Sequence, residues 1–372
     1  MTRLLLAVLL VLPLALSAQS GRARNVVLFL ADAGGISTVA AASWHAHNAP
    51  RGLFIQRMPN IGLSDTTTVQ SIVSDSAAGM TAIVTGQKTL NGVIAQDSTA
   101  VRGKQDGQPL KSILEYAEEQ GLATGIITND ALTGATPASL YAKANDRGHT
   151  AVIFQQVFTP RFGDGPDVMI SGGRGTITKA LAATGVDLET LGNEKKRPVL
   201  RTLSEVPADA TRAIVVLDSG DYSVTDAIQL ATRILSKNPR GYFLMVEWDT
   251  HTDNVRRGLD RMVQLDNAIE QTAKSAGSNT LVIFTADHSF DLRLRGGDNT
   301  RPLLDGLEEA EALRAKEKQP ELQLRAIRMQ NSHTGEPVLV AAQGPGAEGV
   351  RGYFDNTNIF TVMMNAFGWK AN

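Results

Sequence analysis

The chain has 372 residues, more than the roughly 100–200 of an ordinary domain, so its length allows either two domains or one large domain with insertions. With 42% hydrophobic and 20% charged residues, it can form a packed core, which excludes a disordered or collagen-like chain. The 36 Lys and Arg against 38 Asp and Glu give a net charge of −2, which argues against nucleic acid as the main partner. The lack of cysteine excludes disulfides, thiolate metal sites and cysteine nucleophiles.

The N-terminus has the layout of a secretory signal peptide. Arg3 precedes an apolar run at residues 4–16, and small residues follow up to Ala18. The run is too short to span a bilayer comfortably. We therefore expect a signal peptide at residues 1–18, a single catalytic domain at residues 19–372, and a periplasmic or secreted protein with no membrane segment after cleavage. The alternative is a buried N-terminal helix or a retained anchor.

Beyond the leader, strand and helix patterns alternate. Short apolar runs predict buried strands at residues 25–30, 124–128, 167–170, 241–247, 279–287 and 337–342. Helical patterns occur at residues 35–45, 76–85, 110–120, 224–236, 257–275 and 358–367. The alternation predicts an α/β fold with three layers, α/β/α, around a central and largely parallel sheet. Two polar stretches, at residues 174–201 and 299–331, interrupt the alternation and are expected to be surface insertions.

Acidic and histidine residues gather where the predicted strands end. Such ends form the ligand-binding edge of a parallel sheet. The residues concerned are Asp32, Glu247, Asp249, His251, Asp287 and His288, with His333 just before the last strand. Carboxylates and imidazoles without thiolates suit catalytic zinc, or zinc together with magnesium. Any one of these residues alone could equally be a helix cap or an ordinary polar side chain.

A second segment of interest lies around Ser76. Small residues surround this serine at a predicted helix start, where free backbone N–H groups favour an anion. The segment would suit a bound phosphate or a serine alkoxide, and close packing of a Ser/Ala helix is the alternative. No G-x-S-x-G elbow is present.

Six blocks of sequence, taken together and in order, resemble the bacterial alkaline phosphatase family. They are NVVLFLADAGG, SDSAAGMTA followed by TGQKTLNG, ATPASLYAKANDR, MVEWDTHTDN, TADHSF and NSHTGEPVLVAAQGP. The resemblance runs from about residue 25 to the C-terminal helix. It implies the alkaline phosphatase type of α/β/α fold and a metal-dependent hydrolysis of phosphate monoesters at alkaline pH.

The resemblance also implies roles for individual residues. Ser76 matches the nucleophile that is transiently phosphorylated, Arg147 matches the arginine that clamps phosphate, and Asp75 matches the aspartate that orients this arginine. Two Zn²⁺ and one Mg²⁺ are implied. The matching ligands are His251 and His333 for the first zinc, Asp287 and His288 for the second, Asp32 between the second zinc and magnesium, and Thr136 for magnesium. Ser76 is itself expected to bind a metal, which activates its hydroxyl.

One block departs from the family pattern. The family has a magnesium glutamate, a zinc aspartate several residues later and then a histidine, whereas this chain has only Glu247, Asp249 and His251 within five residues. Either Glu247 replaces the zinc aspartate, or Glu247 binds magnesium and Asp249 binds zinc through a shortened loop. The position of the strand end favours the second interpretation. Gly134 stands where some members have an acid or a histidine near magnesium.

Two other functions remain as alternatives. A phosphodiesterase of the same superfamily would lack the arginine clamp and magnesium, so Arg147 and Thr136 favour monoesters. A non-catalytic phosphate- or metal-binding protein would keep the fold without turnover. The expected partners are small phosphate monoesters, and the protein is expected to be a monomer or a homodimer.

Overall fold

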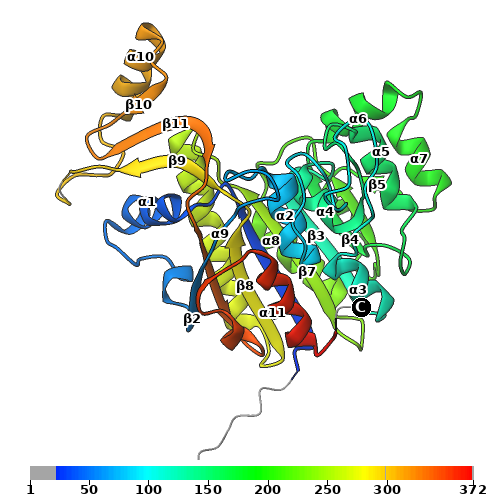
Figure 1. Ribbon diagram of the computed structural model, residues 1–372. Coiled ribbons are helices and arrows are strands. Elements are labelled where there is room, and N and C mark those ends of the chain that lie inside the picture. The colour runs from blue at the N-terminus through cyan, green and yellow to red at the C-terminus, as the bar shows by residue number, and fades with distance from the viewer. Residues whose placement is uncertain (1–21, 298, 371–372) are drawn as a thin grey trace, which may run out of the picture.

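A central sheet dominates the computed structural model, which describes residues 22–297 and 299–370 (Figure 1). Its ten strands have the order β13-β2-β12-β8-β1-β7-β3-β4-β6-β5. Their bounds are β1 Asn25–Asp32, β2 Asn60–Ser64, β3 Ala123–Ala131, β4 Val168–Gly172, β5 Val199–Leu200, β6 Ala213–Val216, β7 Tyr242–Asp249, β8 Thr280–Ala286, β12 Val338–Gln343 and β13 Gly352–Phe354. Strand β12 runs antiparallel to β2 and β8, and the other pairs are parallel. The prediction of a largely parallel sheet is confirmed.

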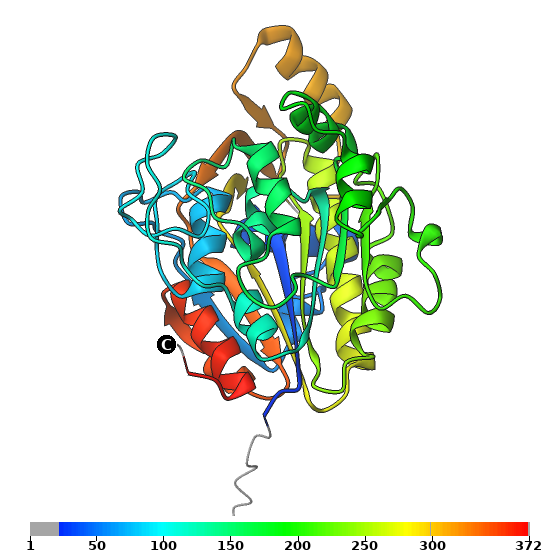
Figure 2. The ribbon, with the colours of Figure 1, turned by 90° about the vertical axis from the view of Figure 1, so that its right-hand side faces the viewer.

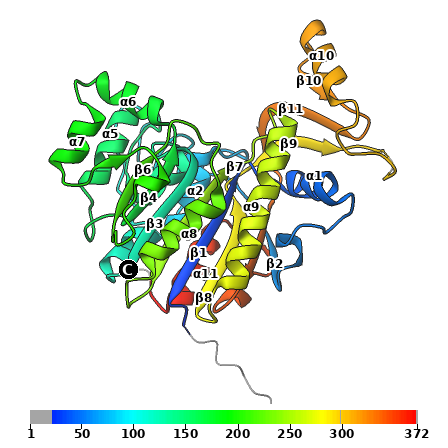
Figure 3. The same cartoon turned by 180° about the vertical axis from the view of Figure 1, so that it is seen from behind.

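Helices cover both faces of this sheet. One face carries α2 Ser76–Thr85, α3 Ile113–Glu119, α4 Ala135–Tyr141, α5 Thr150–Gln155, α6 Arg174–Ala182, α7 Leu188–Glu194 and α11 Thr357–Phe367. The other face carries α1 Ile36–His47, α8 Val224–Leu235 and α9 Val255–Ser275, as the reverse view in Figure 3 shows. Alternate residues of β1 enter the two cores: Leu28 packs into one, and Phe29 into the other. This alternation produces the three layers that were predicted.

The predicted elements agree closely with the structure. The predicted helix at residues 76–85 is α2, Ser76–Thr85. The helix predicted from residue 110 begins instead at Ile113, because Ser112 accepts a hydrogen bond from the N–H of Glu115, and the Glu115 side chain accepts one from the N–H of Ser112. Strands β2, β5, β6 and β13 were not predicted, since these strands of two to five residues are too short to establish a clear pattern.

A small three-stranded sheet projects from the body together with one helix (Figures 1 and 2). We call this region the arm; it consists of β9 Ser289–Leu294, α10 Leu307–Glu317, β10 Glu321–Gln323 and β11 Ile327–Thr334. The strand order is β10-β11-β9, and all pairs are antiparallel. The stretch 299–331, expected to be a surface insertion, contributes α10, β10 and part of β11 to the arm, while the stretch 174–201 contains α6, α7 and β5.

The two ends of the described chain lie apart from the arm (Figure 2). Residue 22 and the end of α11 are close together at the opposite end of the molecule, where the N–H of Ala23 donates to the Ala366 carbonyl over 2.7 Å (Figure 2). The predicted signal peptide at residues 1–18 lies outside the described residues. Within the part of the chain that the structure describes, no helix combines the length and apolar character that a bilayer span requires.

Candidate active site

The carboxyl ends of β1, β7 and β8 meet at one edge of the large sheet and place most of the predicted site residues there. Strand β1 lies between β7 and β8, and Asp32 is in register with Asp249. Glu247 is two residues earlier on β7, and Asp287 directly follows β8. We call this group of side chains, together with the nearby histidines, the carboxyl-edge cluster. The sheet therefore brings together acids that are more than 200 residues apart in the chain.

Three histidines converge on the same edge. The rings of His288 and His333 stack with centroids 3.9 Å apart, and His251 lies 5.8 and 5.6 Å from them. Two of the rings are fixed through Nδ1, which lies 3.1 Å from the Ser289 carbonyl in His288 and 3.1 Å from the Ser74 carbonyl in His333. Because a carbonyl can only accept, Nδ1 carries the proton in both rings and Nε2 keeps a free lone pair.

The side chains form two groups that could each hold a cation. In each group the potential ligand atoms lie within 4.8 Å of one another: His251, His288 and His333 form one group, and Asp32, Asp287 and His288 form the other. Among the described residues, several buried oxygens of this region have no hydrogen-bond partner: Asp32 Oδ1, Thr136 Oγ1, Glu247 Oε2 and Asp287 Oδ2. Unpartnered buried oxygens are unfavourable unless something else binds them, so the donor set fits divalent cations.

Burial and mutual repulsion raise the pKa values of the acids in the cluster. Burial, followed by the charge of Asp287, raises the pKa of Asp32 to about 7. Burial raises the pKa of Asp287 to about 6, although the N–H of Ala33 donates to its carboxylate over 3.2 Å. Burial and the charge of Asp32 also raise the pKa of Glu247 well above its usual value. A nearby cation would remove this penalty by stabilising the charged carboxylates.

The histidines respond in opposite directions. Burial lowers the pKa of His333 to about 4, and the neighbouring His288 adds to this effect. Burial would also lower the pKa of His251, but the charges of Asp32 and Asp249 outweigh it and raise this pKa to about 9. His333 is therefore neutral and ready to bind a cation at physiological pH, whereas His251 must lose a proton to do so.

The predicted nucleophile, Ser76, lies against this cluster. It is the first residue of α2 and only 3% exposed, with Oγ 3.3 Å from His288 Nε2. Asp75 caps the helix by accepting from the N–H of Ala78 over 3.1 Å, and its other oxygen accepts from Arg147 Nη1 over 3.1 Å. Gly79 lets the helix approach closely, because a Cβ there would lie 2.4 Å from the carbonyl oxygen of Asp287. Backbone packing thus holds the serine against the acids.

The remaining predicted residues lie on either side of Asp32. Glu247 is 2% exposed, and the side chains of Thr128 and Thr136 moderate the rise in its pKa. Asp249 is turned toward the histidines, with Oδ1 2.8 Å from His251 Nδ1. The structure thus separates the two acids of the shortened block, placing one near Thr136 and the other beside His251.

Two nearby residues were missed by the sequence analysis. Asp130, near the end of β3, lies beside Gly134: a Cβ on this glycine would be 2.8 Å from Asp130 Oδ2. Its charge contributes to the raised pKa of Glu247. The rule that identified Asp32, an acid at the end of an apolar strand, would also have identified Asp130. The second residue, Arg261, donates to Asp249 from α9, and no local pattern marks it.

Comparison with known proteins decides the family. The family model for alkaline phosphatase matches residues 23–184 and 207–325, which is most of the chain. The chain belongs to the alkaline phosphatase family. It is accordingly an enzyme, a phosphoric monoester hydrolase. Among its curated relatives, the alkaline phosphatase of Escherichia coli K12 is 29% identical over 427 aligned residues, which cover 94% of this chain and 87% of the relative.

Solved alkaline phosphatases share the fold. A mutant of the enzyme from the Antarctic bacterium TAB5, with magnesium bound in its M3 site, is 25% identical to this chain, with a TM-score of 0.75. The match covers 95% of this chain and 100% of the TAB5 chain. The Thermus thermophilus alkaline phosphatase has a TM-score of 0.79 at 24% identity, over 94% of this chain and 92% of its own. Together with the ten-stranded sheet, these likenesses establish the three-layer fold.

Proposed function

We propose that this alkaline phosphatase hydrolyses small phosphate monoesters through a phosphoserine on Ser76 and requires two Zn²⁺ and one Mg²⁺. The observation that carries the proposal is the position of the Ser76 hydroxyl, 3.3 Å from His288, the residue shared by both cation-binding groups. In the first half-reaction, Ser76 Oγ bonds to phosphorus and the bond from phosphorus to the ester oxygen breaks, which releases the alcohol. Water then hydrolyses the phosphoserine, regenerating the hydroxyl and releasing inorganic phosphate.

Arg147 and Asp75 supply the grip on the phosphoryl group. The Arg147 side chain is 35% exposed and reaches Asp75 through one nitrogen, which leaves other guanidinium donors for the substrate. A planar guanidinium can bind two phosphate oxygens at once, a geometry that lysine lacks. A monoester has three non-bridging oxygens and a diester only two, so only a monoester can give two oxygens to the guanidinium and still present a third to the carboxyl-edge cluster. Arg147 thus supports monoesters as the substrate class.

The carboxyl-edge cluster contains suitable ligands for all three ions. We assign His251, His333 and Asp249 to the first zinc, Asp32, Asp287 and His288 to the second, and Asp32, Thr136 and Glu247 to magnesium. Magnesium bound in the M3 site of the TAB5 mutant supports a third ion. Bound cations would lower the pKa of the Ser76 hydroxyl and neutralise charge on the phosphoryl group. At alkaline pH the carboxylates of Asp32 and Asp287 are deprotonated, which is the form that binds cations.

The placement of Glu247 and Asp249 supports the second interpretation of the shortened block. The Glu247 carboxylate is buried near Asp32 and Thr136, and each of these three side chains has an oxygen with no hydrogen-bond partner in the described structure. Asp249 instead contacts His251. Glu247 is thus proposed as the magnesium ligand and Asp249 as the zinc ligand.

The test is the release of p-nitrophenol from its phosphate monoester at alkaline pH. We expect turnover that EDTA abolishes and that Zn²⁺ with Mg²⁺ restores. Ser76→Ala should reduce kcat by roughly three orders of magnitude or more, because the attacking oxygen is lost. The control Ser139→Ala removes another buried hydroxyl, one that donates to the Ala135 carbonyl, and should retain most activity.

Each alternative has its own outcome in the same assay. A phosphodiesterase would prefer bis-p-nitrophenyl phosphate to the monoester, and a non-catalytic binding protein would show no turnover with either ester. Trapping a ³²P-labelled Ser76 adduct at low pH would support the covalent step. A fully active Ser76→Ala variant would contradict it.

We further propose that the protein is exported to the periplasm or secreted after cleavage near Ala18. The support is the arrangement of Arg3, the apolar run and the small residues that follow. Mass spectrometry of the protein recovered from the extracellular or periplasmic fraction should show a chain that starts near Gln19. An intact leader in that fraction would contradict cleavage.

A further inference from the structure

The loop that connects β7 to α9 has only five residues, and His251 is one of them. Strand β7 ends at Asp249 and α9 begins at Val255. One side of this loop is anchored to β1, since Thr250 donates to the Asp32 carbonyl from its N–H over 3.0 Å and from its hydroxyl over 2.7 Å. The anchoring fixes the backbone beside His251 but leaves the Asp249 carboxylate to be held by other contacts.

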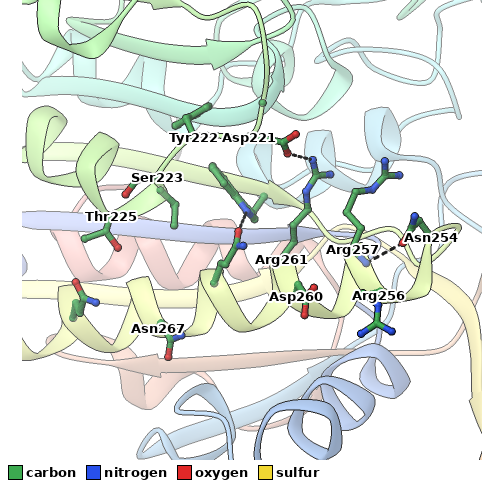
Figure 4. Close-up of a pocket in the computed structure, with 15 residues that line it drawn as sticks. Asp221, Tyr222, Ser223, Thr225, Asn254, Arg256, Arg257, Asp260, Arg261 and Asn267 are labelled. Carbon is green, nitrogen blue, oxygen red and sulfur yellow. Dashed lines mark hydrogen bonds and ion pairs between the residues drawn. The ribbon is translucent and has the colours of Figure 1, made fainter. Parts of the chain in front are cut away.

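Arg261, in the second turn of α9, makes that contact. Its Nη1 donates to Asp249 Oδ2 over 2.7 Å, and its Nη2 donates to Asp221 Oδ1 over 3.1 Å. Figure 4 shows the Arg261 side chain reaching toward Asp221. The Arg261 side chain is 15% exposed, whereas that of Asp221 is 79% exposed. The sheltered contact with Asp249 is therefore the stronger of the two, since water screens the outer one.

The other oxygen of Asp249 continues the chain of contacts into the site. Asp249 Oδ1 accepts from the N–H of His251 over 3.0 Å and lies 2.8 Å from His251 Nδ1. On the opposite side, the N–H of Asp249 donates to Asn129 Oδ1 over 2.8 Å. Rotation of the carboxylate about its own bond would break the contact with Arg261 or with His251. Arg261 thus fixes which oxygen faces the histidine.

We propose that Arg261 is a positioning residue of the active site, which orients Asp249 and through it His251 for the first zinc. The inference rests on the proposed function of the carboxyl-edge cluster. A guanidinium suits this task because its fork can bind two carboxylates at once, here Asp249 at the end of β7 and Asp221 before α8, whereas lysine offers a single point of charge. Residues around a metal site that orient its ligands affect metal affinity without touching the ion.

The neighbouring arginine provides a matched control. Arg257 lies one turn earlier on α9 and lines the same groove of about 790 Å³ as Arg261 (Figure 4). Its guanidinium pairs instead with Asp253 over 3.3 Å, and its side chain is 48% exposed. Removing either guanidinium deletes one positive charge from the same groove, but only Arg261 contacts Asp249. A difference between the two variants therefore isolates the positioning contact from a general change of charge.

The experiment compares Arg261→Met, Arg261→Lys, Asp221→Asn and Arg257→Met as full-length metal-loaded proteins. Zinc bound per chain is measured by mass spectrometry after equilibration with buffered free Zn²⁺, together with kcat, KM and the thermal midpoint. We expect Arg261→Met to weaken one of the two zinc sites by roughly 10–100-fold and to lower kcat/KM, while a cooperative thermal transition in EDTA shows that the variant is folded. Arg261→Lys should recover part of the affinity. Asp221→Asn and Arg257→Met should stay within about twofold of the wild type, as expected for exposed pairs.

Wild-type zinc affinity in Arg261→Met, or an equal loss in Arg257→Met, would overturn the inference. If Arg261→Met does not fold, the zinc affinity of Arg261→Lys tests the inference instead. That variant keeps the positive charge but lacks the planar guanidinium that contacts two carboxylates. Failure of the proposed function is a separate result: the wild type would then bind no zinc or hydrolyse no monoester. If the wild type binds zinc and hydrolyses monoesters but Arg261→Met is unaffected, only the role of Arg261 is disproved.

Discussion

Both edges of the large sheet contain buried charges, but the two clusters differ in how far they satisfy themselves. At the amino ends of β3, β4 and β6 lies a group that we call the amino-edge cluster: Glu118, Thr124, Asp164, Asp167, Arg197 and Arg212. Here Glu118 accepts from the Thr124 hydroxyl and from the N–H of Asp164. Asp167 accepts from the N–H of Thr124. Arg212 forms ion pairs with both Asp164 and Asp167. These carboxylates are held by donors from the protein itself.

The carboxyl-edge cluster lacks such internal compensation. Asp32, Asp287 and Glu247 each keep a buried oxygen without a hydrogen-bond partner among the described residues. The ring nitrogen paired with Asp32 and Asp287 is Nε2 of His288, which carries a lone pair of its own. A protein that can satisfy buried acids at one edge leaves them unsatisfied at the other. The difference indicates that the carboxyl edge is a ligand-binding site, where a bound ligand would satisfy the buried oxygens.

The largest effect is expected from Gly79→Ala, which disturbs the packing at the carboxyl edge without removing any side chain of the cluster. The new methyl group would lie 2.4 Å from the Asp287 carbonyl oxygen, so α2 must move away and carry Ser76 with it. We expect activity to fall by more than about 100-fold and stability to fall by about 1–3 kcal/mol.

Gly175→Ala is the matched control for that substitution. Gly175 lies in α6, and a Cβ there meets nothing within 4 Å. Alanine favours a helix, so this variant should be as stable as the wild type or slightly more so, with unchanged activity. Activity assays and thermal unfolding of both variants check the comparison. Full activity in Gly79→Ala would show that the helix is not held as tightly as described.

The second prediction concerns the pH dependence of stability after EDTA treatment. The folded-state pKa of His251 is raised from its usual value of 6.5 to about 9, so the folded protein binds more protons than the unfolded chain between pH 6.5 and 9. Asp32, whose pKa is raised to about 7, adds to this mainly at lower pH. The free energy of unfolding should therefore fall as pH rises through this window, by roughly 3 kcal/mol. His333, with its pKa lowered to about 4, acts mainly below this window.

Zinc should cancel this fall, because the folded protein would then hold the deprotonated ligands. Asp32→Asn should also reduce it in EDTA, since the substitution removes one titrating group and the charge that raises the pKa of His251. Chemical denaturation at several pH values, with and without Zn²⁺, measures both effects. Identical profiles in the two conditions would argue against a cation site at this edge.

The smallest effect is expected at the amino edge, where Glu118→Gln replaces a carboxylate that already accepts hydrogen bonds from the protein itself. Burial raises the pKa of Glu118 to about 7, so the stability linked to its protonated form is lost as pH rises from about 4.5 to 7. The variant should lose this slope, because glutamine keeps an oxygen for Thr124 and does not ionise.

Unlike the slope at the carboxyl edge, this one should be the same with and without Zn²⁺. Glu119→Gln, which changes a side chain that is 43% exposed and paired with Lys111, is the control. A slope in Glu118→Gln that responded to zinc would mean that the two edges are coupled.

The strand-end residues show how much of the site could be predicted. Asp32 and Asp287 follow continuous apolar runs, and a parallel sheet must align such ends, so their meeting follows from local pattern and topology. His333 is different: it was identified because it precedes the apolar run at residues 337–342, yet it lies in β11 of the arm, a strand that the sequence did not predict. Arg261 could not be predicted, since nothing in the pattern of α9 shows which loop its guanidinium will meet.

The base of the arm has a consequence for how this enzyme can vary. His288 immediately precedes β9, His333 lies in β11, and the pairs Phe290 with His333 and Ser289 with Thr334 close the two strands at the body. Growth or loss of sequence at the tip, around α10, therefore leaves the distance between the two imidazoles unchanged. Evolution, or a protein engineer, can remodel the far end of this projection, even graft a recognition module onto it, while the chemistry at its root stays intact.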